Sequence, residues 1–159
     1  MNYFELFGLP VSLQIDTTQL AKKYFELQKQ SHPDYFTQAT ETEQEEALEK
    51  SSAINKALKI FKDKDSTIKY LLQLKGLLED DEKYQLPPAF LMEVMELNEA
   101  LTADSSGEIH ALEQEMYAGV QRVIEQYEDE KITTEELLQI KEYYFKKKYL
   151  QRILDRLDD

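Results

Sequence analysis

A histidine and an aspartate lie two residues apart in the sequence Ser31-His32-Pro33-Asp34, with a proline between them. An imidazole beside a carboxylate could act as an acid–base pair, although catalysis would also require a pocket and an oriented substrate. At an exposed turn the same side chains could instead bind a partner, because the imidazole forms hydrogen bonds and the carboxylate can accept a bidentate arginine. A third interpretation is structural, with Pro33 ending a helix and Asp34 capping the next turn.

The composition excludes several other kinds of chemistry. The 159-residue chain contains no cysteine, so it can form no disulfide, thiolate nucleophile or cysteine-ligated metal site. Its four glycines are too few and too scattered for a phosphate-binding loop. A formal net charge of −13 argues against binding to nucleic acid or to an anionic membrane. We therefore expect protein partners, no metal or cofactor, and no enzymatic activity.

Nothing in the sequence directs the chain to a membrane. The first residues lack the basic and apolar regions of a signal peptide. No segment approaches the roughly 18 consecutive apolar residues that span a bilayer. We expect a soluble protein of the cytoplasm.

The charge is distributed unevenly along the chain. Residues 1–76 carry 10 basic and 11 acidic side chains, a net charge of −1, whereas residues 77–159 carry 9 and 21, a net charge of −12. The segment between them joins a glycine, an acidic run and a proline pair that could begin the next helix. These features predict a first domain at 1–76, a linker at 77–87 and a second domain at 88–159.

Apolar residues recur at three- and four-residue intervals in both domains, and no alternating strand pattern is evident. The predicted helices lie at about 2–7, 17–32, 40–61, 66–74, 88–102, 106–129 and 134–157. Several of them begin with a capping-box spacing, such as Thr133 with Glu136. The sequence therefore predicts an all-α protein, in which a helical hairpin with short flanking helices precedes a three-helix bundle.

The predicted helix at 88–102 carries two apolar sectors when it is laid out at about 100° per residue. The first sector has the spacing of a core stripe: Phe90, Val94, Leu97 and Leu101. The second holds a leucine and two methionines with neighbouring glutamates: Leu91, Met92, Met95, Glu96 and Glu99. This second sector could be a protein-docking patch, or it could wrap around the core edge or pack on the first domain.

Four features of the first domain occur in a characteristic order. They are Asn2-Tyr3-Phe4-Glu5-Leu6-Phe7-Gly8-Leu9-Pro10, Lys22-Lys23-Tyr24-Phe25, His32-Pro33-Asp34 and Ile54-Asn55-Lys56-Ala57. This order resembles the J-domain of co-chaperones. The resemblance implies docking on a DnaK/HscA-type 70-kDa heat-shock chaperone and stimulation of its ATP hydrolysis. The residues that it implicates are His32, Pro33 and Asp34, with Lys22, Lys23 and Lys29 supplying electrostatic steering.

The sequence of the second domain makes the resemblance more specific, from J-domain co-chaperones in general to one family of them. Phe90-Leu91-Met92-Glu93, followed by Met95-Glu96-Leu97 and Glu99, stands after an acidic linker. This arrangement resembles the carboxy-terminal domain of the HscB co-chaperones, and the likeness covers essentially the full chain. It implies a bacterial form that binds an IscU-type iron–sulfur scaffold and brings it to the chaperone. The implied scaffold-binding residues are Leu91, Met92, Met95, Glu96, Glu99 and Tyr149. A J-domain co-chaperone that delivers a different client is the alternative.

Overall fold

The structure is a computed structural model that describes residues 1–99 and 106–158, with the side chains of residues 98, 99 and 158 also left out of the description. Within the described residues, all regular secondary structure is helical, which confirms the predicted all-α class. The chain divides into two compact units, Met1–Leu74 and Lys75–Asp159. Each unit has its own buried core, so each positions its own surface residues.

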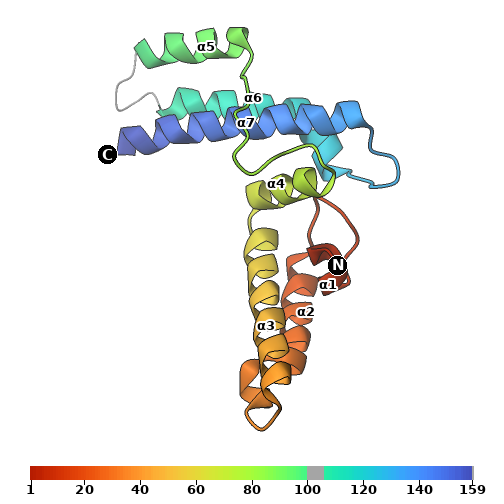
Figure 1. The fold of residues 1–159 in the computed structure, drawn as a ribbon. Coiled ribbons are helices and arrows are strands. Elements are labelled where there is room, and N and C mark those ends of the chain that lie inside the picture. The colour runs from red at the N-terminus through yellow and green to blue at the C-terminus, as the bar shows by residue number, and fades with distance from the viewer. Residues whose placement is uncertain (100–105, 159) are drawn as a thin grey trace. The chain divides into compact units, whose positions relative to one another are not determined.

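The first unit is a helical hairpin with short helices at its ends (Figure 1). Its elements are α1 (Tyr3–Phe7), α2 (Thr17–Ser31), the 3₁₀ helix η1 (Pro33–Phe36), α3 (Glu41–Lys62) and α4 (Lys64–Leu74). Helices α2 and α3 lie side by side, and η1 lies at the turn between them. The predicted hairpin with flanking helices is therefore confirmed.

Local sequence explains where the two hairpin helices begin. The Asp16 carboxylate accepts hydrogen bonds from the backbone N–H groups of Thr18 and Gln19, at 2.9 and 3.2 Å. The Thr40 hydroxyl accepts one from the Glu43 N–H at 3.2 Å. Such caps stabilise a helix start by about 1 kcal/mol each. Both helix starts are thus determined within four residues of sequence.

The end of α1 and the start of α4 also depend on single residues. Gly8 ends α1 with a φ of 63°, in the left-handed region that glycine adopts without strain. Helix α4 begins at Lys64, two residues before the predicted start. The reason is that the Asp63 carboxylate accepts hydrogen bonds from the N–H and hydroxyl groups of Ser66, at 2.9 and 2.7 Å, and so caps α4.

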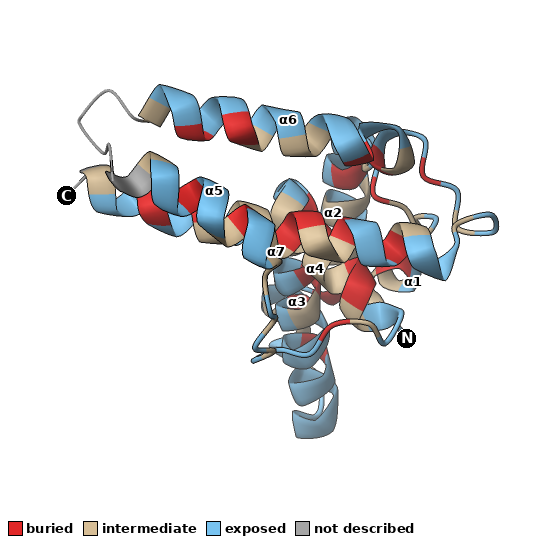
Figure 2. Cartoon of the chain, turned by 90° about the horizontal axis from the view of Figure 1, so that it is seen from above, coloured by how far each residue is buried: buried red, intermediate tan, exposed pale blue. Residues whose placement is uncertain are grey.

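An aromatic cluster holds the base of the hairpin, at the end remote from η1. The Phe4 and Phe61 ring centroids are 4.9 Å apart, and Tyr3 stacks on Tyr70 at the same distance. The Tyr70 hydroxyl accepts a hydrogen bond from the Tyr3 N–H at 2.9 Å. Aromatic pairs of this kind add about 0.5–1.5 kcal/mol beyond the area that they bury. The opposite end of the hairpin, including the first turn of α3, is mostly exposed (Figure 2).

The second unit packs helices α5 (Pro88–Glu99), α6 (Ser106–Glu125) and α7 (Thr134–Asp158) around one core. The buried residues of this core come from all three helices: Phe90, Val94, Ile109, Leu112, Leu150, Ile153 and Leu154. Buried positions recur along α6 and α7 in Figure 2. The predicted three-helix bundle is therefore confirmed.

Helix α7 begins where the sequence predicts, whereas α6 ends earlier than predicted. At α7, the Thr133 N–H donates to the Glu136 carboxylate and the Glu136 N–H donates to the Thr133 hydroxyl, both at 3.1 Å. Helix α6 was predicted to reach residue 129, but it ends at Glu125. Tyr127 lies buried in the loop that follows, and its hydroxyl donates to Asp129 at 2.8 Å. Burying this ring with its hydroxyl paired outweighs another turn of helix.

Candidate functional site

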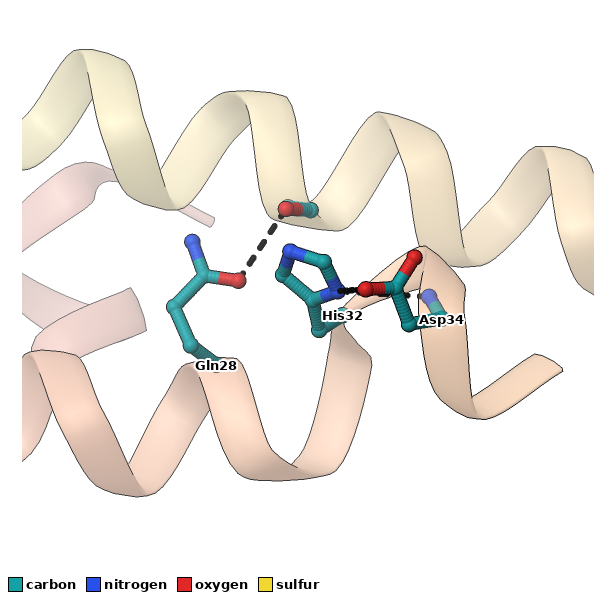
Figure 3. A network of polar contacts seen from close by, with 4 residues as sticks. Gln28, His32 and Asp34 are labelled. Carbon is teal, nitrogen blue, oxygen red and sulfur yellow. Dashed lines mark hydrogen bonds and ion pairs between the residues drawn. The ribbon is translucent and has the colours of Figure 1, made fainter.

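The His32-Pro33-Asp34 sequence lies at the tip of the hairpin, where α2 ends and η1 begins (Figure 3). Both flanking side chains are exposed: 46% of His32 and 86% of Asp34 is accessible to solvent. The His32 Nδ1 atom lies 3.6 Å from a carboxylate oxygen of Asp34. The tip therefore presents an imidazole and a carboxylate side by side, where another protein can reach them.

His32 caps the turn that follows it, so the interpretation with Asp34 as the cap is wrong. The His32 Nδ1 atom accepts a hydrogen bond from the Asp34 backbone N–H at 3.2 Å. Pro33 occupies the first position of η1, where its missing N–H costs nothing. Because Nδ1 is the acceptor, a neutral imidazole carries its proton on Nε2, which can act as a donor. The cap of this turn is therefore the His32 imidazole and not the Asp34 carboxylate.

A network of polar side chains joins α2 to α3 next to the tip. Gln28, one turn before His32, accepts a hydrogen bond from the Ser51 hydroxyl at 3.0 Å (Figure 3). It also donates to Asn55 Oδ1 at 3.1 Å. The Tyr24 hydroxyl donates to the same Asn55 oxygen at 2.9 Å. Hydrogen bonds are directional, so the network sets the register of α2 on α3 and thereby the position of the tip.

The network was not predicted from the sequence, but its spacing carries a signal. Tyr24 and Gln28 are four residues apart on α2, and Ser51 and Asn55 are four residues apart on α3. Side chains at this spacing lie on one face of a helix. Two such polar pairs on helices that form a hairpin are therefore candidates for a shared set of hydrogen bonds.

The three lysines of α2 that were predicted to contact the chaperone differ in their exposure to solvent. Lys22 and Lys29 are exposed, and their seven-residue separation places them on the same side of the helix. Lys23 is partly buried, and its Nζ atom donates to the Gly8 carbonyl at 3.4 Å. Lys23 thus holds the chain after α1 as well as carrying a positive charge.

Two exposed aromatic side chains, neither of them predicted as a site residue, extend this surface. Phe25 is 65% exposed and lies between Lys22 and Lys29 on the same side of α2. Tyr35 is 68% exposed, and its ring centroid is 6.3 Å from that of His32. The signal for Phe25 is its spacing, three residues after one lysine and four before the other.

Helix α5 has one buried and one exposed apolar side. Phe90 and Val94 are 5% and 1% exposed and belong to the core of the second unit. Met92 and Met95 are 64% and 57% exposed, and Leu91 is partly buried. One interpretation of this sector had Leu91 and Met95 wrapping around the core edge; the exposure of Met95 excludes it for that residue, whereas the partly buried Leu91 agrees with it.

Tyr149 of α7 lies next to α5. Its ring is 6.1 Å from the Phe90 ring and inclined to it by 69°. Lys146 places its Nζ atom 5.3 Å from the centre of the same Phe90 ring. Glu96 is exposed on α5, whereas the side chain of Glu99 lies outside the described residues. The fold thus brings one distant predicted residue, Tyr149, to the helix that carries the others.

Two ion pairs hold the segment that leads into α5. Lys141 donates to Glu82 at 2.6 Å, and this hydrogen bond lowers the pKa of the Glu82 carboxyl. Lys75 pairs with Asp129, also at 2.6 Å. Burial by itself would raise the pKa of Asp129, but the hydrogen bonds from Lys75 and Tyr127 outweigh it and the pKa is lowered. Both carboxylates are therefore held in the charged form.

In the described residues, no three His, Cys, Asp or Glu side chains lie close enough together to hold a metal ion. None of the helices in the part of the chain that the structure describes combines the length and apolar character needed to cross a membrane.

Known proteins of related sequence match most of the chain. The family model described as the HSCB C-terminal oligomerisation domain matches residues 86–158. The co-chaperone protein HscB homolog of Psychromonas ingrahamii is 37% identical over 151 residues, which cover 89% of each chain. The co-chaperone protein HscB homolog of Vibrio cholerae is 43% identical over 102 residues, which cover 64% of this chain and 60% of the relative.

Solved structures show the same fold. The crystal structure of human co-chaperone protein HscB matches with a TM-score of 0.77 and 29% identity, covering 99% of this chain and 81% of that one. Chaperone HscB from Vibrio cholerae matches with a TM-score of 0.77 and 30% identity, covering 99% and 96%. The likeness therefore extends over both units.

Proposed function

Because the chain belongs to the HscB family of co-chaperones, we propose that it stimulates ATP hydrolysis by a DnaK/HscA-type 70-kDa heat-shock chaperone and delivers an IscU-type scaffold to it. In this role it assists the maturation of iron–sulfur proteins. The observation that carries the proposal is that two exposed surfaces of different chemistry lie on two compact units. An adaptor requires this arrangement, because it must bind two proteins at once.

The tip of the hairpin contacts the chaperone in this proposal. His32 donates a hydrogen bond through its Nε2–H, and the Asp34 carboxylate accepts an arginine of the chaperone, a pairing that can be bidentate. Pro33 keeps the turn rigid, because its ring fixes one backbone torsion. Little conformational entropy is then lost when the tip binds.

The exposed side of α2 extends the chaperone contact. Lys22, Lys23 and Lys29 attract an acidic chaperone surface and raise the rate of association. Phe25 lies among them and adds an apolar contact, since aromatic side chains at the centre of an interface often contribute a large share of its affinity. Charge and apolar contact thus have separate roles on one helix.

The scaffold binds the exposed side of α5. The proposed contact residues are Leu91, Met92, Met95, Glu96, Glu99 and Tyr149. Methionine side chains are flexible and adapt to the shape of a partner. Burying the exposed parts of Met92 and Met95 contributes about 25 cal/mol for each Å² of apolar surface. The neighbouring glutamates favour basic groups on the scaffold.

A different client protein is the main alternative. The alignment with the Vibrio cholerae relative covers only 60% of that protein's length. The identity of the chaperone and of the scaffold is therefore part of the proposal. The match of residues 86–158 to the HSCB carboxy-terminal domain favours the scaffold, because this range includes α5 and α7. A location in the bacterial cytoplasm remains a prediction.

An acid–base enzyme is disfavoured by the geometry of the tip. His32 and Asp34 are exposed, and the His32 Nδ1 atom already accepts the Asp34 N–H. General acid–base catalysis needs a substrate that is held and oriented near both groups. The relatives carry the name co-chaperone, which agrees with a role in binding.

Single-turnover ATP hydrolysis by a DnaK/HscA-type chaperone tests the proposal. The rate is measured with the chain or its His32→Gln variant, each with and without an IscU-type scaffold. We expect stimulation that requires His32 and that increases further when the scaffold is present. Stimulation by the His32→Gln variant equal to that of the parent chain would contradict the proposed role of the tip.

The scaffold half of the proposal has its own test. Alanine at Leu91, Met92 and Met95 should abolish binding to the scaffold and remove the extra stimulation that the scaffold brings, while leaving basal stimulation unchanged. Stimulation that requires His32 but ignores the scaffold would favour the alternative client.

A further inference from the structure

A cavity of about 240 Å³ lies beside Tyr149, between the segment that precedes α5 and helix α7. Its lining includes three basic side chains and three aromatic rings: Lys83, Lys148 and Arg152, with Tyr84, Phe145 and Tyr149. None of the three basic side chains belongs to the chaperone or scaffold surfaces described above. The cavity therefore adds a basic site to a unit that is otherwise acidic.

The walls of this pocket are held by contacts within the second unit. The Tyr84 and Phe145 rings stack with their centroids 4.6 Å apart and their planes 3° from parallel. Lys141 pairs with Glu82 at 2.6 Å and lies 5.6 Å from the centre of the Tyr84 ring. Since Glu82 is the acidic side chain in the lining, this ion pair neutralises it. The pocket is thus formed and basic in the unbound chain.

The basic side chains of the pocket differ in their ion pairing from Lys141 and Lys146 of α7. Lys141 and Lys146 pair with carboxylates, at 2.6 and 3.4 Å. Among the described residues, no carboxylate lies within ion-pair distance of Lys83, Lys148 or Arg152. Residues 77–159 contain 21 acidic and 9 basic side chains, so acidic partners are abundant in this unit. The positive charge at the pocket is therefore left for an external anion.

A second cavity in the same unit also contains basic side chains, but more of its charged groups are paired. It has a volume of about 290 Å³ and lies at the turn between α6 and α7. Its lining contains Arg122 and Lys131, but Lys131 pairs with Glu128 at 3.2 Å. Glu136, also in the lining, is held by Thr133 in the capping box. Much of the charge in this cavity is already paired, so it offers less attraction to an anion.

We propose that the pocket binds an aspartate or glutamate side chain of the scaffold whose main contact is the exposed side of α5. Tyr149 joins the two sites, because it is one of the proposed scaffold contacts and also lines the pocket. Arg152 can bind a carboxylate through two hydrogen bonds, and Lys148 adds a point charge. The inference rests on the proposed function and names a specific contact within it.

The test compares two double variants that remove the same charge. Lys148→Gln with Arg152→Gln removes two cations from the pocket, and Arg122→Gln with Lys131→Gln removes two from the other cavity. All four side chains are exposed, so both variants are expected to fold. Scaffold binding is measured by calorimetry at several salt concentrations. We expect the pocket variant to bind about tenfold more weakly, with a smaller salt dependence, and the control to bind within about twofold of the parent chain.

Scaffold binding by the Met92→Ala, Met95→Ala double variant is measured as well, so that failure of the pocket inference can be distinguished from failure of the proposed function. Loss of binding in the methionine variant, with equal affinities in the two charge variants, would overturn the pocket inference and leave the proposed function standing. Failure of the parent chain to bind the scaffold would overturn both. Weaker binding in the pocket variant alone supports the inference.

The occupant is identified by a second experiment. Exposed Asp and Glu residues of the scaffold are changed to Asn and Gln one at a time, and each variant is measured against the parent chain and the pocket variant. We expect one scaffold carboxylate whose substitution weakens binding to the parent chain but not to the pocket variant. Absence of any such carboxylate would overturn the inference. So would saturable binding of inorganic phosphate that the pocket variant loses, because that result would assign the pocket to a free anion.

Discussion

The hairpin tip and the exposed side of α5 are constructed in opposite ways. The tip is polar, and its shape depends on His32, Pro33 and Asp34, which are consecutive in the chain. The α5 surface is largely apolar, and it gains Tyr149 only because α7 packs beside α5. A local motif can be recognised in the sequence and tolerates changes elsewhere. A surface assembled from two helices depends on the packing of a whole unit.

Because the two surfaces lie on separate units, we expect that a substitution can remove either one and leave the other intact. Leu150→Ala and Ile54→Ala each remove a fully buried side chain, one from each unit. We expect each to cost about 2–5 kcal/mol in the free energy of unfolding of its own unit. Leu150→Ala should lose scaffold binding and keep basal chaperone stimulation, whereas Ile54→Ala should do the reverse. Calorimetry and single-turnover ATP hydrolysis measure the two activities. Loss of both activities in either variant would show that the units are not independent.

A smaller effect is expected at the α5 surface itself. Met92→Ala with Met95→Ala should weaken scaffold binding by about 1–3 kcal/mol, because both side chains are exposed and available to a partner. The unfolding free energy should change by less than about 0.5 kcal/mol, since neither side chain is in the core. Leu138→Ala is the control, because Leu138 is an exposed apolar residue of the same unit. Equal scaffold affinities in the two variants would refute the assignment.

On α2, substitution can separate apolar contact from charge. Phe25→Ala should raise the concentration of half-maximal ATPase stimulation about five- to tenfold, with an unchanged dependence on salt. Lys22→Gln with Lys29→Gln should reduce the salt dependence. Leu48 on α3 is 60% exposed, similar to Phe25, so Leu48→Ala is the matched control. A loss in Leu48→Ala as large as that in Phe25→Ala would indicate a general effect of exposed apolar surface.

The smallest expected effect is on the acid stability of the second unit. Glu82 has its pKa lowered from the ordinary value of 4.5 by Lys141. A carboxyl with a lower pKa when folded stabilises the fold fully above its unfolded pKa, and this stabilisation is lost as the pH falls through the folded value. The parent chain should therefore lose about 0.5–1 kcal/mol more than Lys141→Gln between pH 6 and pH 3. Urea unfolding, with hydrogen exchange to identify the unit, measures the difference. Parallel stability curves would mean that the ion pair contributes nothing.

Sequence reasoning succeeded where the determinants are local. The start of α7 was predicted from the capping-box spacing at Thr133, and the starts of α2 and α3 were predicted next to Asp16 and Thr40. The structure contains a capping hydrogen bond at all three residues. It failed where a distant contact competes with local preference. Helix α6 was extended over Tyr127, whose burial with a partner at Asp129 ends the helix early. The turn at the tip was located correctly, and of its three interpretations the one with Asp34 as the cap is wrong, because the His32 ring accepts the capping hydrogen bond.

The sequence by itself therefore determined the all-helical class, most of the helix positions and the position of the tip. These features depend on apolar periodicity, caps and a proline, all of which act over a few residues. Only the tertiary structure decided which side chains remain outside the cores and which charges stay unpaired. Met92, Met95 and Phe25 are exposed, and Lys148 and Arg152 meet Tyr84 at one pocket. Exposure and charge pairing depend on helices that meet in space, and spacing along a single helix cannot specify which helix it will meet.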